Sequence, residues 1–431
     1  MNVCKALGEA ITLHYMPTNK FTTDYFSIHF ILPLREETVT GYSLLTKLFK
    51  KGCRAYPTQA SLAKALEELY SATINISVSK QGEQQVVSLG TETLSSRFVF
   101  DDTPVADKAN RLLCDVLTDP YLEDGVFSSA YVAREKVALK NQIRAAINNK
   151  NTYALKRCRE IMCEGEAYSL ALDGTEEAVE LLTPASLYSL YLDMLRTASI
   201  EFFYIGSDPV TVVEERIAAL LARFPARAPV KAETVIMPEA KRVKRVTESV
   251  SAVQGKLAIG FRTGLTPEAT RRDKDAVLLF NLLYGASPVS KLFMNVREKL
   301  SLCYYCASRN DTAKGVLFVY SGIENANAQK AEEEILFQLQ QIQNGAVTEE
   351  ELLCAKRTLR DLTRSVSDSP SAIEQWYLTR LASCDNRSPE QVYEDFEMLT
   401  VEDAQRAAKR VTLDTVFFLF GEGEGEDSDE L

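Results

Sequence analysis

The feature that most constrains the fold is an internal duplication of the sequence. The segment FSIHFILPL at 26–34 aligns with LAIGFRTGL at 257–265, at an offset of 257 − 26 = 231, and both are apolar runs typical of strands. Later, TASIEFFYIG at 197–206 matches DTVFFLFG at 414–421, with an offset of 421 − 206 = 215 between the closing glycines. The chain therefore reads as two homologous halves that differ by insertions and deletions.

Each half has the same predicted order: a strand, two helices, two strands, a helical stretch and a last strand. Residues 62–69 and their counterparts 293–300 both carry a helical pattern followed by an extended run. Gly82 is the predicted turn of a hairpin in the first half. In the second half, one helix is predicted to end at Gly345, and a capping box begins the next helix at Thr348.

This order of elements predicts an α+β fold, in which each half forms an antiparallel-rich sheet covered by helices. The predicted boundaries are 1–224 for the first half and 246–421 for the second. Between them, 225–245 is rich in proline and charge, as is typical of a linker. The acidic Gly/Glu tail at 422–431 is predicted to be disordered, because it has no apolar residues to bury apart from the final leucine.

The composition excludes several classes of partner. The chain has 49 Lys and Arg against 60 Asp and Glu, a net charge of −11, and no long basic stripe. We therefore expect neither a nucleic acid nor a membrane as partner. The start of the chain lacks the pattern of a secretory signal, and no apolar run reaches the ~18 residues that a membrane span needs. A cytoplasmic protein is expected.

The nine cysteines are an odd number without a framework spacing, which favours reduced and mostly buried thiols. Cys303 and Cys306 form a CxxC motif in an apolar, extended segment, where we expect packing rather than redox or zinc chemistry. A zinc site assembled from scattered cysteines, such as Cys158 and Cys163, stays open as an alternative.

A family resemblance rests on the run NLLYGASPVSKLFMNVREKLSLCYY at 281–305. With the duplication, this run resembles the pitrilysin/insulinase-type metallopeptidases, the inverzincins, over essentially the whole chain. Residues 56–89 and the DDTPV at 101–105 further resemble a non-catalytic subfamily, the elongation factor P (EF-P) 5-aminopentanol modification-associated proteins. The resemblance implies a clamshell of two α+β halves, often closed by a second such chain.

The family's zinc site is absent from this sequence. A catalytic zinc needs about three protein ligands, which the family supplies with His-x-x-Glu-His on a helix and a later Glu. The matching stretch, 42–46, reads Tyr-Ser-Leu-Leu-Thr, and the later position, 135 + 7 = 142, is Gln142, although the supporting Glu135 is retained. His14 and His29 lie in strand-like runs and cannot replace the helical pair. We therefore expect no catalytic residue and no metal in this chain. The helix that contains residues 42–46 is expected to present an ordinary apolar face.

The resemblance also implies a peptide-binding pair in the second half. Arg297 and Tyr304 have the family's spacing, 304 − 297 = 7. Arginine presents a rigid fork of donors and tyrosine a hydroxyl, and both can donate to a peptide carbonyl that gains charge during hydrolysis. We expect Tyr305 to pack instead, since successive side chains of a strand point to opposite faces.

Together these features predict a subunit that is not an enzyme on its own. The resemblance implies a heterodimer with a zinc-bearing homologue, in which this chain binds the peptide substrate and zinc is a cofactor of the partner only. A homodimer stays open, and a link to EF-P modification is expected from the subfamily. The alternative is a non-proteolytic binding or scaffold protein of the same fold. A third interpretation, a zinc endopeptidase, requires stoichiometric zinc in the chain.

Overall fold

The computed structural model describes residues 3–101 and 103–423, which form two compact units. The first unit contains the chain up to Arg144, then Leu170–Glu233 and Ser369–Glu374. The second contains Ala145–Ser169, Thr234–Asp368 and the chain from Gln375 onward. Each unit thus includes a segment from the other half of the sequence.

These units are groups of residues in mutual contact, whereas the predicted boundaries mark the two duplicated halves of the sequence. The two divisions answer different questions, so the predicted boundaries stay a prediction. The tail predicted at 422–431 lies, from residue 424 on, outside the described residues.

In the described part of the chain, the first unit is built on a six-stranded sheet with the order β1-β2-β8-β3-β5-β4. Its neighbouring strands are antiparallel except β2 and β8, which are parallel. The strands are β1 (Val3–Gly8), β2 (Ile11–Pro17), β3 (Thr23–Pro33), β4 (Thr73–Gln81), β5 (Gln84–Leu94) and β8 (Ser199–Gly206). The central strand β3 confirms the strand predicted at 26–34, and Gly82, at φ 54°, forms the predicted β4–β5 turn.

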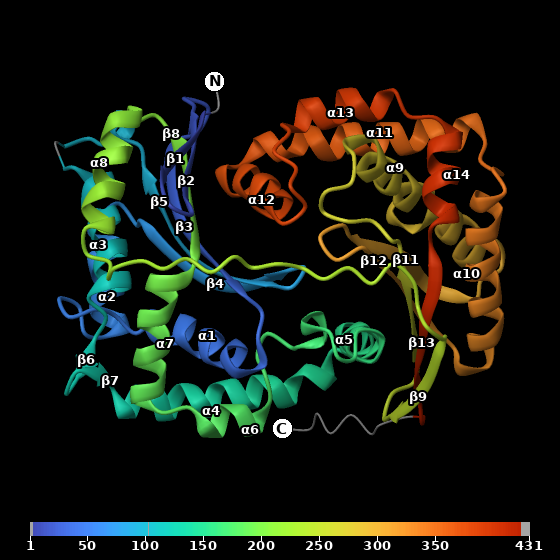
Figure 1. Ribbon diagram of the computed structural model, residues 1–431, viewed down its shortest axis with the longest axis horizontal. Coiled ribbons are helices and arrows are strands. Elements are labelled where there is room, and N and C mark those ends of the chain that lie inside the picture. Colours follow the sequence, from blue (N-terminus) through green and yellow to red (C-terminus); the bar gives the residue numbers. More distant parts are fainter. Residues whose placement is uncertain (1–2, 102, 424–431) are drawn as a thin grey trace. The chain divides into compact units, whose positions relative to one another are not determined.

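Helices cover one face of this sheet (Figure 1). Alternate β3 residues, such as Phe26, Ile28 and Phe30, point into the apolar core on that face. The helices are α1 (Glu36–Phe49), α2 (Gln59–Glu67), α3 (Val105–Thr118), α4 (Ser129–Ala145), α6 (Glu176–Leu181), α7 (Pro184–Thr197) and α8 (Val210–Leu221). A short hairpin consists of β6 (Leu122–Glu123) and β7 (Val126–Phe127), and η1 (Ser96–Phe98) is a 3₁₀ turn.

The second unit repeats this topology on a five-stranded sheet of the described residues, with the order β11-β12-β10-β13-β9. Only β13 and β9 are parallel. The strands are β9 (Lys244–Val250), β10 (Gly255–Arg262), β11 (Cys303–Asp311), β12 (Val316–Ile323) and β13 (Thr412–Gly421). The order matches β4-β5-β3-β8-β2 of the first unit, as expected of a duplication, and it confirms the predicted α+β fold with antiparallel-rich sheets.

Both faces of the second sheet are covered. Leu257 and Ile259 point into a core shared with most helices of the unit, whereas Ala258 packs against α5 (Lys150–Met162) on the other face. The remaining helices are α9 (Arg271–Asn281), α10 (Ala328–Gln343), α11 (Glu349–Ser365), α12 (Pro370–Leu381), α13 (Pro389–Glu397) and α14 (Val401–Lys409). Two π-helical segments, η4 (Leu282–Ala286) and η5 (Leu292–Lys299), follow α9. Short 3₁₀ turns are η2 (Ala146–Asn148), η3 (Ala167–Ser169), η6 (Asn325–Asn327) and η7 (Val366–Asp368).

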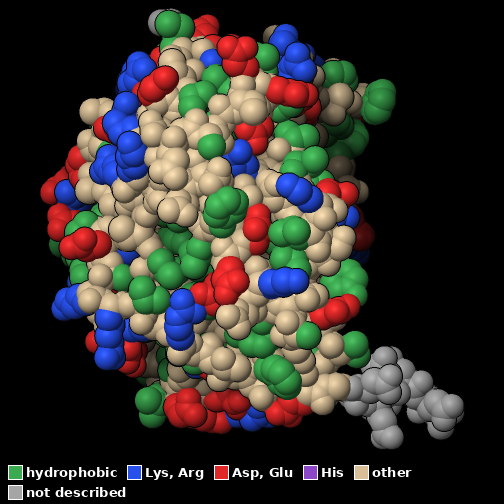
Figure 2. Space-filling model, turned by 90° about the vertical axis from the view of Figure 1, so that its right-hand side faces the viewer, with side chains coloured by type: hydrophobic (Ala, Val, Ile, Leu, Met, Phe, Trp, Pro, Cys, Tyr) green, Lys and Arg blue, Asp and Glu red, His purple; other side chains and the backbone are tan. Residues whose placement is uncertain are grey.

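The capping signals in the second half are confirmed. The Glu351 amide donates to the Thr348 hydroxyl at 3.2 Å, and the Thr348 amide donates to the Glu351 carboxylate at 2.8 Å. Gly345, at φ 80°, follows the end of α10. In the part of the chain that the structure describes, no helix combines the length and apolar character that crossing a bilayer requires. Charged side chains of both signs are interspersed over the face drawn in Figure 2.

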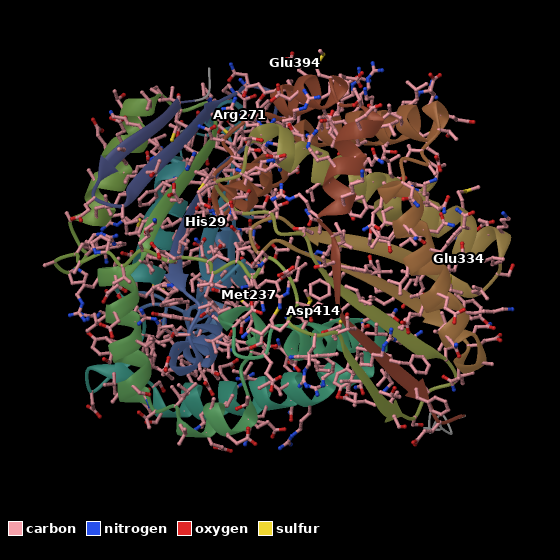
Figure 3. All side chains as sticks on the ribbon, turned by 45° about the vertical axis from the view of Figure 1, so that its right-hand side comes forward. His29, Met237, Arg271, Glu334, Glu394 and Asp414 are labelled. Carbon is pink, nitrogen blue, oxygen red and sulfur yellow. The ribbon has the colours of Figure 1, made fainter. Side chains whose placement is uncertain are left out.

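On the second face of the first sheet, a buried carboxylate anchors the start of α12. Glu374 accepts hydrogen bonds from the Tyr25 hydroxyl at 2.9 Å, from His29 Nε2 at 2.9 Å and from the Ser27 hydroxyl (His29 is labelled in Figure 3). Burial opposes the negative charge, but these hydrogen bonds outweigh it and lower the pKa of Glu374 below its ordinary value of 4.5. The charged form of Glu374 therefore stabilises the folded state.

The substitution Glu374→Gln tests this anchor, because it keeps the size of the side chain and removes its charge. A pKa that is lower in the folded than in the unfolded state contributes stability above pH 4.5, and this contribution is lost as the pH falls below that value. At neutral pH we expect the free energy of unfolding to fall by about 2 kcal/mol. Urea denaturation of both proteins across the acidic range should show the difference shrinking.

The control is Glu215→Gln, on the exposed side of α8. It should leave stability within about 0.5 kcal/mol of the native chain at every pH. A difference for Glu374→Gln that stayed constant with pH would contradict the role assigned to its charge.

Candidate functional site

The stretch that replaces the zinc-binding motif lies in the buried part of α1. Tyr42, Leu44 and Leu45 are between 0 and 3% exposed and belong to the main core of the first unit. The Thr46 hydroxyl donates to the Ser43 carbonyl at 2.8 Å, so its hydrogen-bonding capacity is used within the helix. The predicted apolar helix face is confirmed.

The third ligand position is occupied by an amide that links two charged side chains. Gln142, on α4, accepts a hydrogen bond from Lys47 Nζ at 2.8 Å and donates one to Asp173 Oδ2 at 2.9 Å. The amide thus uses both its acceptor and its donor. A glutamate there would accept from Lys47 but would repel Asp173.

The retained carboxylate, Glu135, is engaged in a buried ion pair. Glu135 is 7% exposed, and its Oε1 lies 2.8 Å from Lys51 Nζ. A buried carboxylate needs a charge partner, and lysine supplies one positive charge where the family has a metal ion nearby. The ion pair neutralises the charge of Glu135, so this carboxylate does not need a metal ion for that purpose.

The side chains that the structure describes do not fit a zinc ion. Among the described residues, no group of three or more His, Cys, Asp or Glu side chains could hold a metal. His14 instead pairs with Glu201 at 2.8 Å, and His29 pairs with the α12 carboxylate.

The cysteine alternative also lacks geometric support. Cys158 and Cys163 are buried, and the Cys158 thiol donates to a backbone carbonyl of β10. Burial raises the pKa of Cys163 to about 12 and that of Cys158 further, which disfavours the thiolate form that binds metals.

The first residue of the predicted peptide-binding pair, Arg297, lies in the last turn of η5. Its side chain is 41% exposed, and its guanidinium lies 4.7 Å from the centre of the Phe293 ring. This stacking limits the positions that the guanidinium can adopt. Its Nε lies 3.5 Å from the Glu298 carboxylate, an exposed ion pair that contributes little and leaves the terminal amino groups available. π-Helical segments such as η4 and η5 are frequent at functional sites.

The second residue, Tyr304, projects from a β-bulge at the edge of the sheet. Cys303 pairs with Ile323 and Tyr305 pairs with Gly322, so Tyr304 is the extra residue of β11. Tyr304 is 57% exposed. Both members of the predicted pair therefore present exposed donors from adjoining segments.

Neighbouring residues have other roles. Tyr305 donates to Asn151 and lies beside Tyr320, with ring centres 6.1 Å apart, as expected of a packing residue, although it is only half-buried. Cys303 was expected only to pack, but a hydrogen bond from Cys306, assisted by Ser321 and Arg297, lowers its pKa to about 7. The bulge puts both cysteines on one face, since their partners in β12 are two residues apart.

The fold and the substituted zinc positions define a metallopeptidase-like protein without the family's zinc ligands. A family model described as "Peptidase M16 inactive domain" matches residues 182–359. A relative named "Probable inactive metalloprotease YmfF", from Bacillus subtilis (strain 168), is 31% identical over 421 residues, which cover 98% of each chain. This chain therefore belongs to the M16 (pitrilysin) family.

Solved structures agree with this fold. A conserved protein from Enterococcus faecalis V583 has a TM-score of 0.89 and 28% identity, with 99% of this chain and 100% of that chain covered. A peptidase M16 inactive domain from Pseudomonas fluorescens has a TM-score of 0.80 and 17% identity, with 99% of both chains covered. At 17% identity, the similarity to the Pseudomonas fluorescens structure supports the fold alone.

A metal analysis tests the lost site. We expect substoichiometric zinc in the purified chain by plasma mass spectrometry, because Gln142 and Glu135 are occupied by lysine partners. Dialysis against EDTA should leave the thermal unfolding midpoint unchanged, whereas a structural zinc would make it fall. One zinc per chain, or a lower midpoint after chelation, would contradict this interpretation of the site.

Proposed function

We propose that this chain is the non-catalytic subunit of a pair, in which a zinc-bearing homologue cuts the peptide and this chain helps to bind it. The observation that carries the proposal is a contrast between two regions. The groups at the predicted zinc positions are buried in the core or hydrogen-bonded to neighbouring residues, whereas Tyr304 is exposed and Arg297 is partly exposed, with Glu298 at 3.5 Å from its Nε. A chain without ligands for zinc but with donors for peptide can serve a reaction that its partner catalyses.

The chemistry of the pair suits a peptide carbonyl. Arg297 is permanently charged, and the Tyr304 hydroxyl can donate a hydrogen bond to the same oxygen. Donors fixed before the reaction stabilise negative charge as it develops on that oxygen. Phe293 beneath the guanidinium and the bulge that projects Tyr304 support such a fixed arrangement.

The EF-P link is a finer part of the same proposal. It is supported by the resemblance of 56–89 and 101–105 to the EF-P modification-associated subfamily. We propose that the peptide or protein bound by the pair belongs to that modification pathway. Co-purification from the native cell, followed by mass spectrometry, would identify both the partner and the bound protein.

The test of the paired function is a peptidase assay with the zinc-bearing homologue. We expect the two chains to co-elute in size-exclusion chromatography and to cut a peptide that neither cuts efficiently alone. Arg297→Ala should lower kcat/KM of the pair by about a hundredfold, as for loss of one donor to the reacting oxygen, and Tyr304→Phe should lower it by a similar or smaller factor.

The matched control is Arg309→Ala, an exposed arginine farther along β11. It should leave both pairing and the peptidase rate unchanged. Failure of the two chains to associate, or an unchanged rate in Arg297→Ala, would refute the proposal.

The second candidate is a binding or scaffold protein with no proteolysis. It is favoured by the same contrast, because exposed donors without a metal site can hold a peptide that is never cut. In that case the chain alone, as a monomer or homodimer, binds peptide, and Arg297→Ala weakens this binding without any protease being present.

A further inference from the structure

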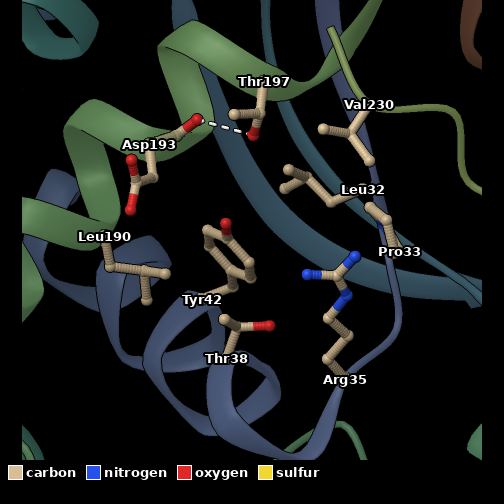
Figure 4. A pocket seen from close by; sticks show the side chains of 9 residues that line it. All are labelled: Leu32, Pro33, Arg35, Thr38, Tyr42, Leu190, Asp193, Thr197 and Val230. Carbon is tan, nitrogen blue, oxygen red and sulfur yellow. Dashed lines mark hydrogen bonds between the residues drawn. The ribbon is translucent and has the colours of Figure 1, made fainter. Parts of the chain in front are cut away.

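A small hollow lies in the first unit where the end of β3 leads into α1. Its volume is about 210 Å³. Apolar walls come from Leu32, Leu190 and Val230, whereas the polar groups include Arg35 and Asp193 (Figure 4). The volume is below the range of about 300–1,000 Å³ for drug-sized ligands, so only a small molecule fits.

Tyr42, at the position of the family's first histidine ligand, points into this hollow. The residue is 3% exposed, and among the described residues no hydrogen bond to its hydroxyl is found. Burial raises the pKa of Tyr42, Asp193 raises it further, and Arg35 opposes them. The hydroxyl is therefore protonated and available as a donor. The hydroxyl faces the hollow, where a ligand can accept its hydrogen bond.

Two opposite charges flank the tyrosine. Figure 4 shows the Arg35 guanidinium on one side of the Tyr42 ring and Asp193 on the other. In the described part of the chain, the Arg35 side chain has no ion pair or hydrogen bond. Asp193 pairs with Arg196 through Oδ1 only, in an exposed contact that contributes little, so Oδ2 can accept from a ligand.

We propose that this hollow binds an aliphatic α-amino acid. Its carboxylate would lie against Arg35 and the Tyr42 hydroxyl, its ammonium group against Asp193, and its side chain against Leu32 and Leu190. A simple anion would be repelled by Asp193, and an uncharged apolar molecule would use none of the three polar groups. The zwitterion satisfies each group, and the site is independent of the peptide-binding pair.

Calorimetric titration of the full chain with L-leucine tests the proposal, with thermal shift as a second readout. Two leucine analogues isolate the charges: 4-methylpentanoate lacks the amino group, and isoamylamine lacks the carboxylate. N-acetyl-leucine distinguishes the free amino acid from a peptide C-terminus. We expect L-leucine to bind and each analogue to bind at least about tenfold more weakly, the effect of one charged hydrogen bond.

Three variants assign the contacts. Arg35→Gln, Asp193→Asn and Tyr42→Phe should each weaken L-leucine binding, the first two by about tenfold. Arg54→Gln, an exposed arginine that does not line the hollow, should bind like the native chain. Circular dichroism and the unfolding midpoint without ligand show whether each variant folds.

Tyr42→Phe keeps the ring in the core, so it preserves the test if another variant is unstable. Absence of heat and of thermal shift with L-leucine would overturn the proposal. Equal binding of 4-methylpentanoate or N-acetyl-leucine would overturn the zwitterion as ligand. Loss of leucine binding would leave the peptidase assay of the pair unaffected, so the two proposals fail separately.

Discussion

The central strands β3 and β10 set the main constraint on each unit. Because the side chains on both faces of each strand are buried, other segments must pack on both faces. One face of each sheet packs under helices that are close in sequence. On the other face, a segment from the opposite half of the chain contacts the central strand: Ser369–Glu374, through Glu374, on the first sheet and Ala145–Ser169, through α5, on the second. The two contacts differ in chemistry. The first is polar, with Glu374 bonded to Ser27 and His29, and the second is apolar, with α5 against Ala258.

The same demand for satisfied buried groups is met at the positions where the family resemblance places the zinc ligands. A buried carboxylate is costly unless a cation neutralises it. Lys51 supplies that cation for Glu135, and Lys47 and Asp173 complete the hydrogen bonds of Gln142. Tyr42 and Leu45 add apolar contacts to the core.

Much of this architecture follows from the sequence, because periodicity and turn residues are local signals. The strands around Phe26 and Leu257, the turn at Gly82 and the capping box at Thr348 are all present as predicted. The strand β9 was missed, since it pairs with a strand far away in the sequence and begins within the predicted linker. Packing of α5 against the second sheet was missed for the same reason.

The residues of the candidate site remain a prediction from the sequence motif, and their surroundings could not be predicted from it. A motif gives the positions of Arg297, Tyr304 and the lost ligands. It does not show that a bulge projects Tyr304, that Phe293 supports Arg297, or that Lys51 neutralises Glu135, because these contacts depend on tertiary packing. The CxxC motif was the available signal for the low pKa of Cys303, and its effect depends on the same bulge.

The β-bulge in β11 also affects how readily the protein associates with itself at high concentration. β11 is an edge strand, and a regular edge offers a continuous row of amides and carbonyls on which a foreign chain can polymerise. The extra residue interrupts this regular row of backbone groups near the N-terminal end of β11. The irregularity that displays the phenol therefore also guards the molecule against fibrous self-association.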